Sequence, residues 1–237
     1  SCNTTDFDSK GFGTEQVQKR LNVLLPEATI SRMDYDTTRR KFAHQEIIRE
    51  FEQGRIDILV GTQMVTKGLD FDNVAVVGIL NADNMLHYPD FRAHERAFQL
   101  MMQVAGRAGR KGKQGKVLLQ TYDDTHGVIQ LLKAHDFKHF YSEQIAERKL
   151  FNYPPFSRII GITLKHRDKN RLDKAANQLA TQLRKSFGHR VLGPEYPSIS
   201  RIRNYYHKDI LLKIEQKASV KKAKTFLATI IEKLQEQ

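Results

Sequence analysis

The chain has 237 residues, of which 40% are hydrophobic, and its formal net charge is +12. This length and apolar content predict a globular protein with one large domain or two smaller ones. No apolar run approaches the length that crosses a bilayer, and the N-terminus lacks the basic-then-apolar order of a signal peptide. The single cysteine, Cys2, excludes an intrachain disulfide. We therefore expect a cytoplasmic protein with no membrane partner.

The positive charge is concentrated in the last third of the chain. Residues 1–150 contain 21 Lys and Arg against 20 Asp and Glu, whereas residues 151–237 contain 18 against 7. Such a local excess favours an anionic polymer as partner, most often a nucleic acid, because bound cations release its counterions. A basic domain without a polyanionic partner remains the alternative.

The first part of the chain alternates strand and helix patterns. Strands are predicted at 28–33, 56–62, 74–80 and 116–121, and helices at 14–25, 42–54, 89–106 and 126–135. This alternation is typical of a parallel sheet flanked by helices. Ligands of such sheets bind beyond the carboxyl ends of the strands, where we expect the loops 61–70 and 103–110 to lie.

The pattern changes at "NYPPFSR", residues 152–158, where two prolines predict a rigid break. The predicted elements after it are strands at 158–166, 190–194, 198–206 and 209–216, and helices at 171–187 and from 219 onward. Their order predicts a small ferredoxin-like α+β domain.

The segment "QVAGRAGR", residues 103–110, holds two arginines among small residues. The alanines and glycines leave the backbone bare, so a large anion can approach Arg107 and Arg110, whose guanidinium groups suit phosphate oxygens. The chain contains no G-x-x-x-x-G-K-[S/T] loop, no acidic pair after an apolar strand and no His or Cys set with metal-ligand spacing. These features predict one half of a nucleotide site, which another half completes.

Two motifs carry a family resemblance. "DILVGTQMVTKGLDF" followed by "QVAGRAGR" resembles motifs V and VI in the second RecA-like lobe of superfamily 2 helicases. The longer strings "RMDYDTTRRK", "LNADNMLHYPDFRAHERAFQLMMQVAGRAGR" and "YPPFSR" resemble the primosomal protein N′ family, the PriA-type replication restart helicases, over essentially all of residues 11–237.

The resemblance implies an α/β fold with two domains. Residues 11–150 would form the second RecA-like lobe with motifs IV to VI, a parallel sheet with helices on both faces. Residues 151–237 would form the basic, ferredoxin-like α+β C-terminal domain. The implied activity is that of an ATP-dependent 3′-to-5′ DNA helicase, which uses ATP and Mg²⁺, restarts stalled forks and assembles the primosome with other primosome proteins.

The resemblance also assigns roles to single residues. Gln103, Arg107 and Arg110 match motif VI, in which Arg110 would be the arginine finger. Gly68 and Asp70 match the part of motif V that faces the nucleotide, and Thr62 the part that contacts a DNA phosphate. An ion pair within the lobe for the arginines, and loop capping for Thr62 and Asp70, remain the alternatives.

The first motor lobe of the family is missing, so we expect this chain to be a fragment that is inactive as an ATPase by itself. In the family a zinc-ribbon insertion precedes the Gly-Thr-Glu that begins here at Gly13. Residues 1–10 would then be its remnant and Cys2 a residual zinc ligand. Because one cysteine cannot hold zinc, we expect zinc in the full-length protein and not in this fragment. An unrelated free thiol is the alternative.

Two groups of basic residues in the last domain are candidate binding sites. Arg201, Arg203, Tyr205 and Tyr206 interleave cations with aromatic rings, as nucleic-acid-binding surfaces do, and strand alternation would place Arg201, Arg203 and Tyr205 on one face. Inward packing of the tyrosines as core is the alternative.

The second group lies at the start of the final helix, which Ser219 is expected to cap. Lys221, Lys222 and Lys224 occupy its first turns, where the helix dipole already favours an anion. In the resembled family the C-terminal domain engages the acidic tail of the single-stranded DNA-binding protein, and we expect these lysines to contribute to that contact. Exposed lysines without a role are the alternative.

Two other functions stay open at this point. One is a non-enzymatic nucleic-acid-binding scaffold with a degenerate motor lobe, and the other is a different superfamily 2 motor. The intact Gly68, Asp70, Arg107 and Arg110 favour a working motor over the scaffold.

Overall fold

The structure is a computed structural model, and it describes residues 13–38, 42–62, 65, 74–109 and 115–235. The chain divides into two compact units, Ser1–Phe137 and Lys138–Gln237. This division precedes most of helix α6 (Phe137–Leu150), whereas the sequence placed the boundary after residue 150. The predicted limits of the domains stay predictions, and each unit is described by itself below.

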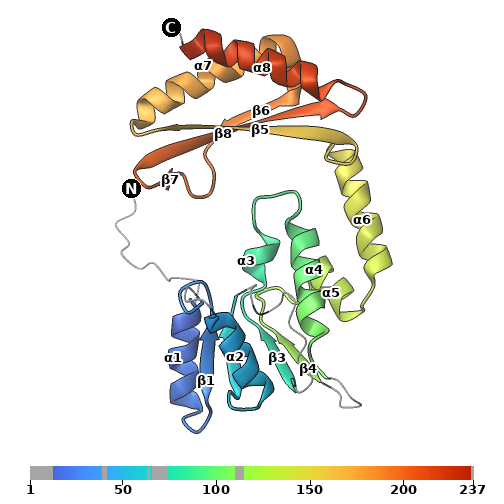
Figure 1. The fold of residues 1–237 in the computed structure, drawn as a ribbon. Helices are drawn as coiled ribbons and strands as arrows, with labels where there is room; N and C mark the ends of the chain where they lie inside the picture. The colour runs from blue at the N-terminus through green and yellow to red at the C-terminus, as the bar shows by residue number, and fades with distance from the viewer. Residues whose placement is uncertain (1–12, 39–41, 63–64, 66–73, 110–114, 236–237) are drawn as a thin grey trace. The chain divides into compact units, whose positions relative to one another are not determined.

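In the first unit every strand and helix expected from the sequence is present, and α3 (Asp83–Leu86) is an additional short helix. The elements are α1 (Thr14–Leu24), β1 (Ile30–Met33), α2 (Ala43–Glu52), β2 (Ile58–Gly61), β3 (Val76–Ile79), α4 (Ala93–Ala105), β4 (Lys116–Leu119) and α5 (Gly127–Lys133) (Figure 1).

The strands of this unit pair in parallel, β1 with β2 and β3 with β4. Helices cover both faces of the β1–β2 pair, because neighbouring residues of a strand point to opposite faces. The guanidinium group of Arg32 lies 3.7 Å from Glu15 of α1, and the fully buried Met33 packs against Ile47 and Phe51 of α2. The predicted parallel α/β architecture is therefore confirmed.

The β3–β4 pair is less evenly covered. Helix α4 lies against β3, and α4 and α5 bury Phe98, Met101 and Ile129. On the face of the pair that carries Val76 and Leu118, these two side chains are 54% and 63% exposed.

The second unit is an antiparallel sheet with two helices on one face. Its elements after α6 are β5 (Ser157–His166), α7 (Lys169–Phe187), the 3-10 turn η2 (Gly188–Arg190), β6 (Val191–Glu195), β7 (Arg201–Ile202), β8 (Tyr205–Glu215) and α8 (Val220–Gln235). The strand order is β5–β8–β6, and β7 pairs with β8. Strands β5 and β6, which α7 connects, thus flank β8, as in the split β-α-β arrangement of the ferredoxin-like fold.

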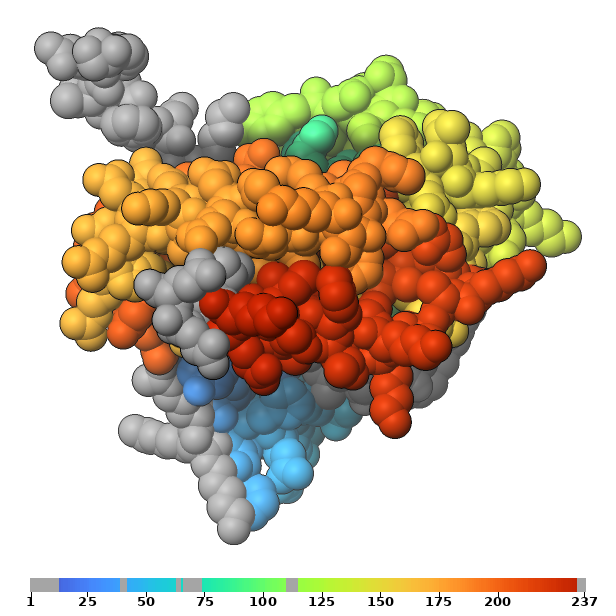
Figure 2. All heavy atoms as spheres, turned by 90° about the horizontal axis from the view of Figure 1, so that it is seen from above, coloured from blue at the N-terminus to red at the C-terminus, as the bar shows by residue number. Residues whose placement is uncertain are grey.

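Helices α7 and α8 lie side by side on the sheet (Figure 1), and Figure 2 shows them as the outer surface of this unit. The core beneath them comes from alternate positions of β8. Ile210, Leu212 and Ile214 are at most 4% exposed and pack with Leu183 of α7 and Leu227 of α8. The period of two along β8 therefore decides which residues the helices cover.

Candidate nucleotide-binding and nucleic-acid-binding sites

The arginine segment 103–110 begins in the last turn of α4. Gln103 is exposed there, and Arg107 lies half-buried in the turn that follows, where its backbone N–H donates to the carbonyl oxygen of Val104 (3.0 Å). Arg110 lies outside the described residues. The roles of these three residues stay predictions.

Backbone hydrogen bonds locate this segment at the amino ends of two strands. The N–H of Gly109 donates to the carbonyl of Val74, and the N–H of Lys116 donates to the carbonyl of Ala75; both distances are 2.9 Å. Val74 and Ala75 immediately precede β3. The expectation that the segment lies beyond the carboxyl ends is therefore wrong. The reason is topological: the helix between two parallel strands carries the chain back to the end at which the next strand starts.

Small residues in this loop also serve the packing of the chain itself. Gly109 has a φ of 73°, and a Cβ atom on Gly115 would lie 2.2 Å from the nitrogen of Gly109 and 2.8 Å from the Cβ of Ala108. The backbone at Gly115 therefore crosses directly over Ala108 and Gly109, which only small residues permit. The expected access of a phosphate to the same backbone stays a prediction.

The nucleotide-facing residues of motif V, Gly68 and Asp70, lie outside the described residues. Val74, which accepts the hydrogen bond from Gly109, follows that segment in the sequence. The loop of motif VI is thus tied to the chain that leaves motif V. Thr62 is exposed at the carboxyl end of β2, where its carbonyl accepts a hydrogen bond from the N–H of Val65 (3.1 Å).

A buried carboxylate that the sequence did not single out joins α1 to β1. Asp34 is 8% exposed; its Oδ2 accepts a 2.6 Å hydrogen bond from the hydroxyl of Thr14, and its Oδ1 accepts from the backbone N–H groups of Asp36 and Thr37. The Nε of Arg32 lies 3.0 Å from Oδ2. The signal for this junction was the string "DYDTT", because an Asp followed by hydroxyl residues forms local side-chain turns.

Burial raises the pKa of Asp34, but the hydrogen bonds from Thr14 and Thr37 and the charge of Arg32 lower it by more, so the net pKa lies below the ordinary value of 3.8. The carboxylate is therefore held in its charged form. Its contacts are all within the unit, which indicates a structural role.

The aromatic and basic residues of the second unit lie on a tight hairpin. Arg203 and Asn204 have φ values of 48° and 65° and connect β7 to β8, so Arg203 is in the turn and not on a strand. Across the hairpin Arg201 pairs with Tyr206, and Ile202 with Tyr205. Cross-strand partners share a face, so Arg201 and Tyr205 lie on opposite faces. The predicted shared face of Arg201, Arg203 and Tyr205 is wrong, because the turn interrupts the alternation.

Neither tyrosine belongs to the buried core. The guanidinium carbon of Arg201 lies 5.1 Å from the ring centre of Tyr206. Tyr205 is half-buried, with the Nζ of Lys165 at 5.9 Å and the guanidinium carbon of Arg167 at 5.2 Å from its ring centre. Cations therefore do accompany both rings, but in two separate groups.

The start of α8 agrees with the expected cap. The hydroxyl oxygen of Ser219 accepts a 3.3 Å hydrogen bond from the backbone N–H of Lys222. Lys221, Lys222 and Lys224 are exposed, and the first turn of the helix contains no acidic residue.

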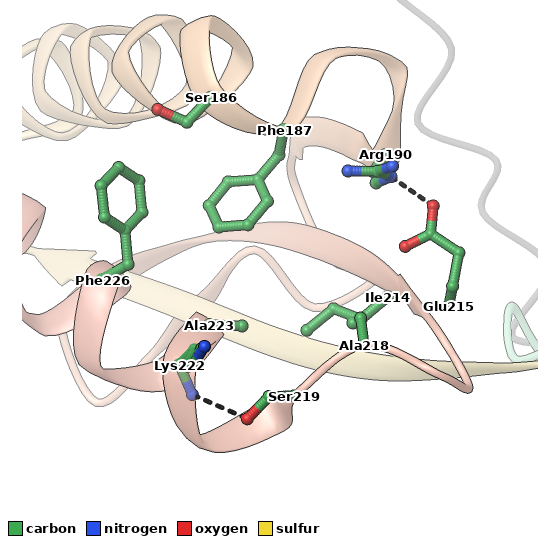
Figure 3. A pocket seen from close by; sticks show the side chains of 10 residues that line it. All are labelled: Ser186, Phe187, Arg190, Ile214, Glu215, Ala218, Ser219, Lys222, Ala223 and Phe226. Atoms are coloured by element: carbon green, nitrogen blue, oxygen red, sulfur yellow. Dashed lines mark hydrogen bonds and ion pairs between the residues drawn. The ribbon is translucent and has the colours of Figure 1, made fainter.

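A groove of about 430 Å³ lies between the end of α7 and the start of α8 (Figure 3). Its apolar part contains the edge-to-face rings of Phe187 and Phe226, whose centroids are 5.6 Å apart. Its polar part contains Lys222 and an ion pair between Arg190 and Glu215, with 2.6 Å between Nε and Oε1. The groove can accept an apolar side chain next to an anion.

Within the part of the chain that the structure describes, no three His, Cys, Asp or Glu residues group as metal ligands do. Cys2 lies outside those residues, so the residual zinc ligand stays a prediction. Over the same described ranges, no helix is long and apolar enough to cross a membrane.

Two family comparisons match the chain in sequence order. Residues 7–112 match the helicase conserved C-terminal domain, and residues 149–237 match the primosomal protein N C-terminal domain. The match of the second family begins close to the change of pattern at "NYPPFSR".

The chain is also similar to single proteins that share one name. The replication restart protein PriA of Bacillus subtilis is 43% identical over 212 residues, which cover 89% of this chain and 26% of the relative. The proteins of the same description from Synechocystis and Treponema pallidum are each 37% identical over 90% of this chain, covering 26% and 32% of their own lengths. The chain thus spans about a quarter to a third of the length of these relatives.

One solved structure, the C-terminal domain of the DEAD-box protein Dbp5, is 17% identical with a TM-score of 0.35, and it covers 55% of this chain and 75% of its own. This similarity is too low to support an inference.

Proposed function

Because the chain belongs to the family of PriA replication restart proteins over the part that it spans, we propose that it is the second motor lobe and C-terminal domain of a helicase that restarts stalled replication forks. The proposed motor is driven by ATP, moves 3′ to 5′ on DNA and assembles the primosome with other primosome proteins. The single observation that supports this proposal best is the hydrogen bond from Gly109 to Val74, which ties the arginine loop to the chain that follows motif V.

The residues present fit one half of an ATP site. The loop after α4 combines Arg107 with a bare backbone, and a hydrogen bond ties it to Val74, which follows motif V in the sequence. ATP and Mg²⁺ supply the phosphoryl group and neutralise its oxygens when they are bound. In the proposed mechanism Arg110 brings positive charge to the γ-phosphate when the lobes close, while Arg107 and Gln103 hold the phosphates, and Gly68 and Asp70 face the nucleotide.

We expect Arg110→Ala in the full-length protein to lower DNA-stimulated ATP hydrolysis by about 10³-fold or more, because an arginine finger stabilises charge that develops only in the transition state. Steady-state turnover with saturating single-stranded DNA measures this effect. Lys111→Ala is the matched control, since it removes a neighbouring cation without touching motif VI, and it should stay within about threefold of wild type.

Binding of DNA should be unchanged in the Arg110→Ala protein. Turnover within about tenfold of wild type, far less than a lost finger costs, would contradict the assignment of Arg110. It would favour a scaffold in which the motor lobe no longer works.

The nucleic-acid contacts belong to the same proposal. Thr62 lies exposed at the end of β2, where its hydroxyl can donate to a DNA phosphate. Arg201, Arg203, Tyr205 and Tyr206 stay candidates for DNA contacts, now divided between the two faces of the hairpin.

We also propose that the start of α8 binds the acidic tail of the single-stranded DNA-binding protein. Its support is the exposure of Lys221, Lys222 and Lys224 on a capped helix end without a nearby acid in the first turn. The groove beside Lys222 offers an apolar surface next to these charges (Figure 3).

Charge reversal by Lys221→Glu with Lys222→Glu should weaken binding of a fluorescent acidic tail peptide by about tenfold or more, because it replaces attraction by repulsion at the helix end. Fluorescence anisotropy gives the affinity. Lys174→Glu with Lys185→Glu on α7 changes the net charge equally and should have a much smaller effect. Equal losses for both pairs would indicate a general charge effect and would place the site elsewhere.

A further inference from the structure

We propose that the face of the β5–β8 sheet turned away from α7 and α8 binds single-stranded DNA through Tyr205, Lys165 and Arg167, a group that we name the Tyr205 platform. The proposal rests on the proposed function for its choice of DNA, and it separates Tyr205 from Arg201 and Tyr206, which lie on the other face of the hairpin.

The register of the sheet establishes which face carries the platform. Lys165 of β5 pairs with His207 of β8, and positions two apart along β8 share a face, so Tyr205, His207 and Lys165 lie together. The alternate positions of β8 point the other way: Lys208 and Ile210 are buried on the face that the helices cover. Helices α7 and α8 cover one face of the sheet (Figure 1), and the register therefore places the platform on the other face.

The platform combines an aromatic ring with two exposed cations. Lys165 and Arg167 are exposed, and their charged groups lie 5.9 Å and 5.2 Å from the ring centre of the half-buried Tyr205. Ile202, the cross-strand partner of Tyr205, is 48% exposed beside it. A stacked base on an apolar and aromatic surface, with phosphates on flanking cations, is how proteins bind single strands without sequence preference.

The same hairpin provides a contrast on its other face. There the ring of Tyr206 is accompanied by Arg201, and Lys208 is only 8% exposed and forms a 2.7 Å ion pair with Asp173 of α7. Asp173 also accepts a 2.6 Å hydrogen bond from the hydroxyl of Tyr196. Lys208 is thus used to hold the fold together, whereas neither Lys165 nor Arg167 forms an ion pair within the part of the chain that the structure describes.

The footprint is limited to the hairpin end of the sheet. Toward the other end Lys213 donates to the carbonyl of Phe151 (2.6 Å) and lies over the ring of Tyr153, so the segment after α6 occupies that region. Between the two ends Asp209 accepts a 2.7 Å hydrogen bond from Thr163 and brings negative charge to this face. A strand of DNA therefore fits beside Tyr205 and not along the whole sheet.

A single strand suits this surface better than a duplex. The ring of Tyr205 can stack only on a base whose face is accessible, and paired bases in a duplex present their edges instead. The excess of positive charge in residues 151–237 supplies the general attraction to phosphate.

The test is the binding of a fluorescent oligothymidine to the whole chain, measured by anisotropy at several salt concentrations. Tyr205→Leu should weaken binding about tenfold, the effect of one lost stack. Lys165→Gln with Arg167→Gln should lower the slope of log K against log salt by about 0.7 for each phosphate contact removed. Both cations are exposed, so this second variant keeps the fold even if Tyr205→Leu does not.

Lys174→Gln and Lys185→Gln on α7 are the matched controls, because they remove exposed cations from the side of the sheet that the helices cover. They should alter binding less than about twofold, and a duplex of equal length should bind without dependence on Tyr205. Equal effects on both faces, or no effect on the platform, would overturn the proposal. If the wild-type chain binds but the platform variants bind equally well, only the platform fails, whereas failure of the proposed motor would appear in the Arg110→Ala turnover, which this assay does not measure.

Discussion

At the scale of single residues, Asp34 shows how one buried charge can organise a junction. Its two carboxylate oxygens accept hydrogen bonds from the start of α1 and from the turn after β1, and they form an ion pair with Arg32. Removal of this acceptor leaves buried donors without a partner, which costs more than an ordinary hydrogen bond.

We expect Asp34→Asn to lower the free energy of unfolding at pH 7 by about 2 kcal/mol, because an amide accepts at only one of the two positions and loses the attraction to Arg32. Urea denaturation of the chain measures this change. The exposed Asp124→Asn in the loop before α5 is the control and should cost less than about 0.5 kcal/mol.

The same pair of proteins gives a pH test. The pKa of Asp34 is lower in the folded chain than its ordinary value of 3.8, so its contribution to stability is complete above that value and is lost as the pH falls through the folded pKa. The difference between wild type and Asp34→Asn should therefore shrink below about pH 4. A difference that grows on acidification would contradict the charged state of Asp34.

At the scale of elements, the two turn residues of the β7–β8 hairpin decide on which face of the sheet each basic or aromatic side chain lies. Both turn residues have a positive φ, the geometry of two-residue hairpin turns that match the twist of the strands. Asn204 suits this conformation, whereas Arg203 adopts it at a cost, because its Cβ approaches the following carbonyl oxygen.

Arg203→Asn should raise the free energy of unfolding by about 0.5 kcal/mol, because asparagine tolerates the left-handed region better. Urea denaturation followed by circular dichroism is the measurement. Arg201→Asn makes the same chemical change on β7 and should stabilise nothing, since it removes the contact with Tyr206. Equal effects at both positions would argue against a turn at Arg203.

At the scale of the whole molecule, the two units differ in their motifs and in their net charge. The first unit holds the motifs from which a nucleotide half-site is proposed, and its 18 Lys and Arg balance 18 Asp and Glu. The second unit has 21 Lys and Arg against 9 Asp and Glu and so holds the whole excess of positive charge. The proposed division of labour follows: one part of the chain responds to ATP and the other supplies contacts to nucleic acid and to an acidic partner.

We expect the 237-residue chain by itself to hydrolyse no ATP above background, because its sequence contains no phosphate-binding loop with the lysine that binds the β- and γ-phosphates. A coupled assay with and without single-stranded DNA is the measurement, with the full-length protein as positive control. Hydrolysis by the isolated chain that Arg110→Ala abolishes would show that the half-site works without a second lobe.

The sequence alone determined the strands of the first unit, most of the helices and the family, because hydrophobic periodicity and short motifs are local properties. It did not predict α3 or α6. Neighbouring residues were sufficient to predict the apolar runs of β1 to β4 and the Ser219 cap. The strands predicted at 198–206 and 209–216 are wrong in their limits, because a turn at Arg203 and Asn204 divides the first one and β8 begins at Tyr205. The strings around Gln103, Arg107 and Arg110 were sufficient for the family resemblance because each is a contiguous motif.

Only the tertiary structure decided where these motifs lie. The end of the sheet at which the arginine loop sits depends on the return path of α4, and the face of Tyr205 depends on how many residues form the turn before it. The junction at Asp34 joins residues that are 20 positions apart. Such contacts arise from chain topology and from register, and a shift of one residue in register exchanges the two faces of a strand, which no local pattern of side chains can specify.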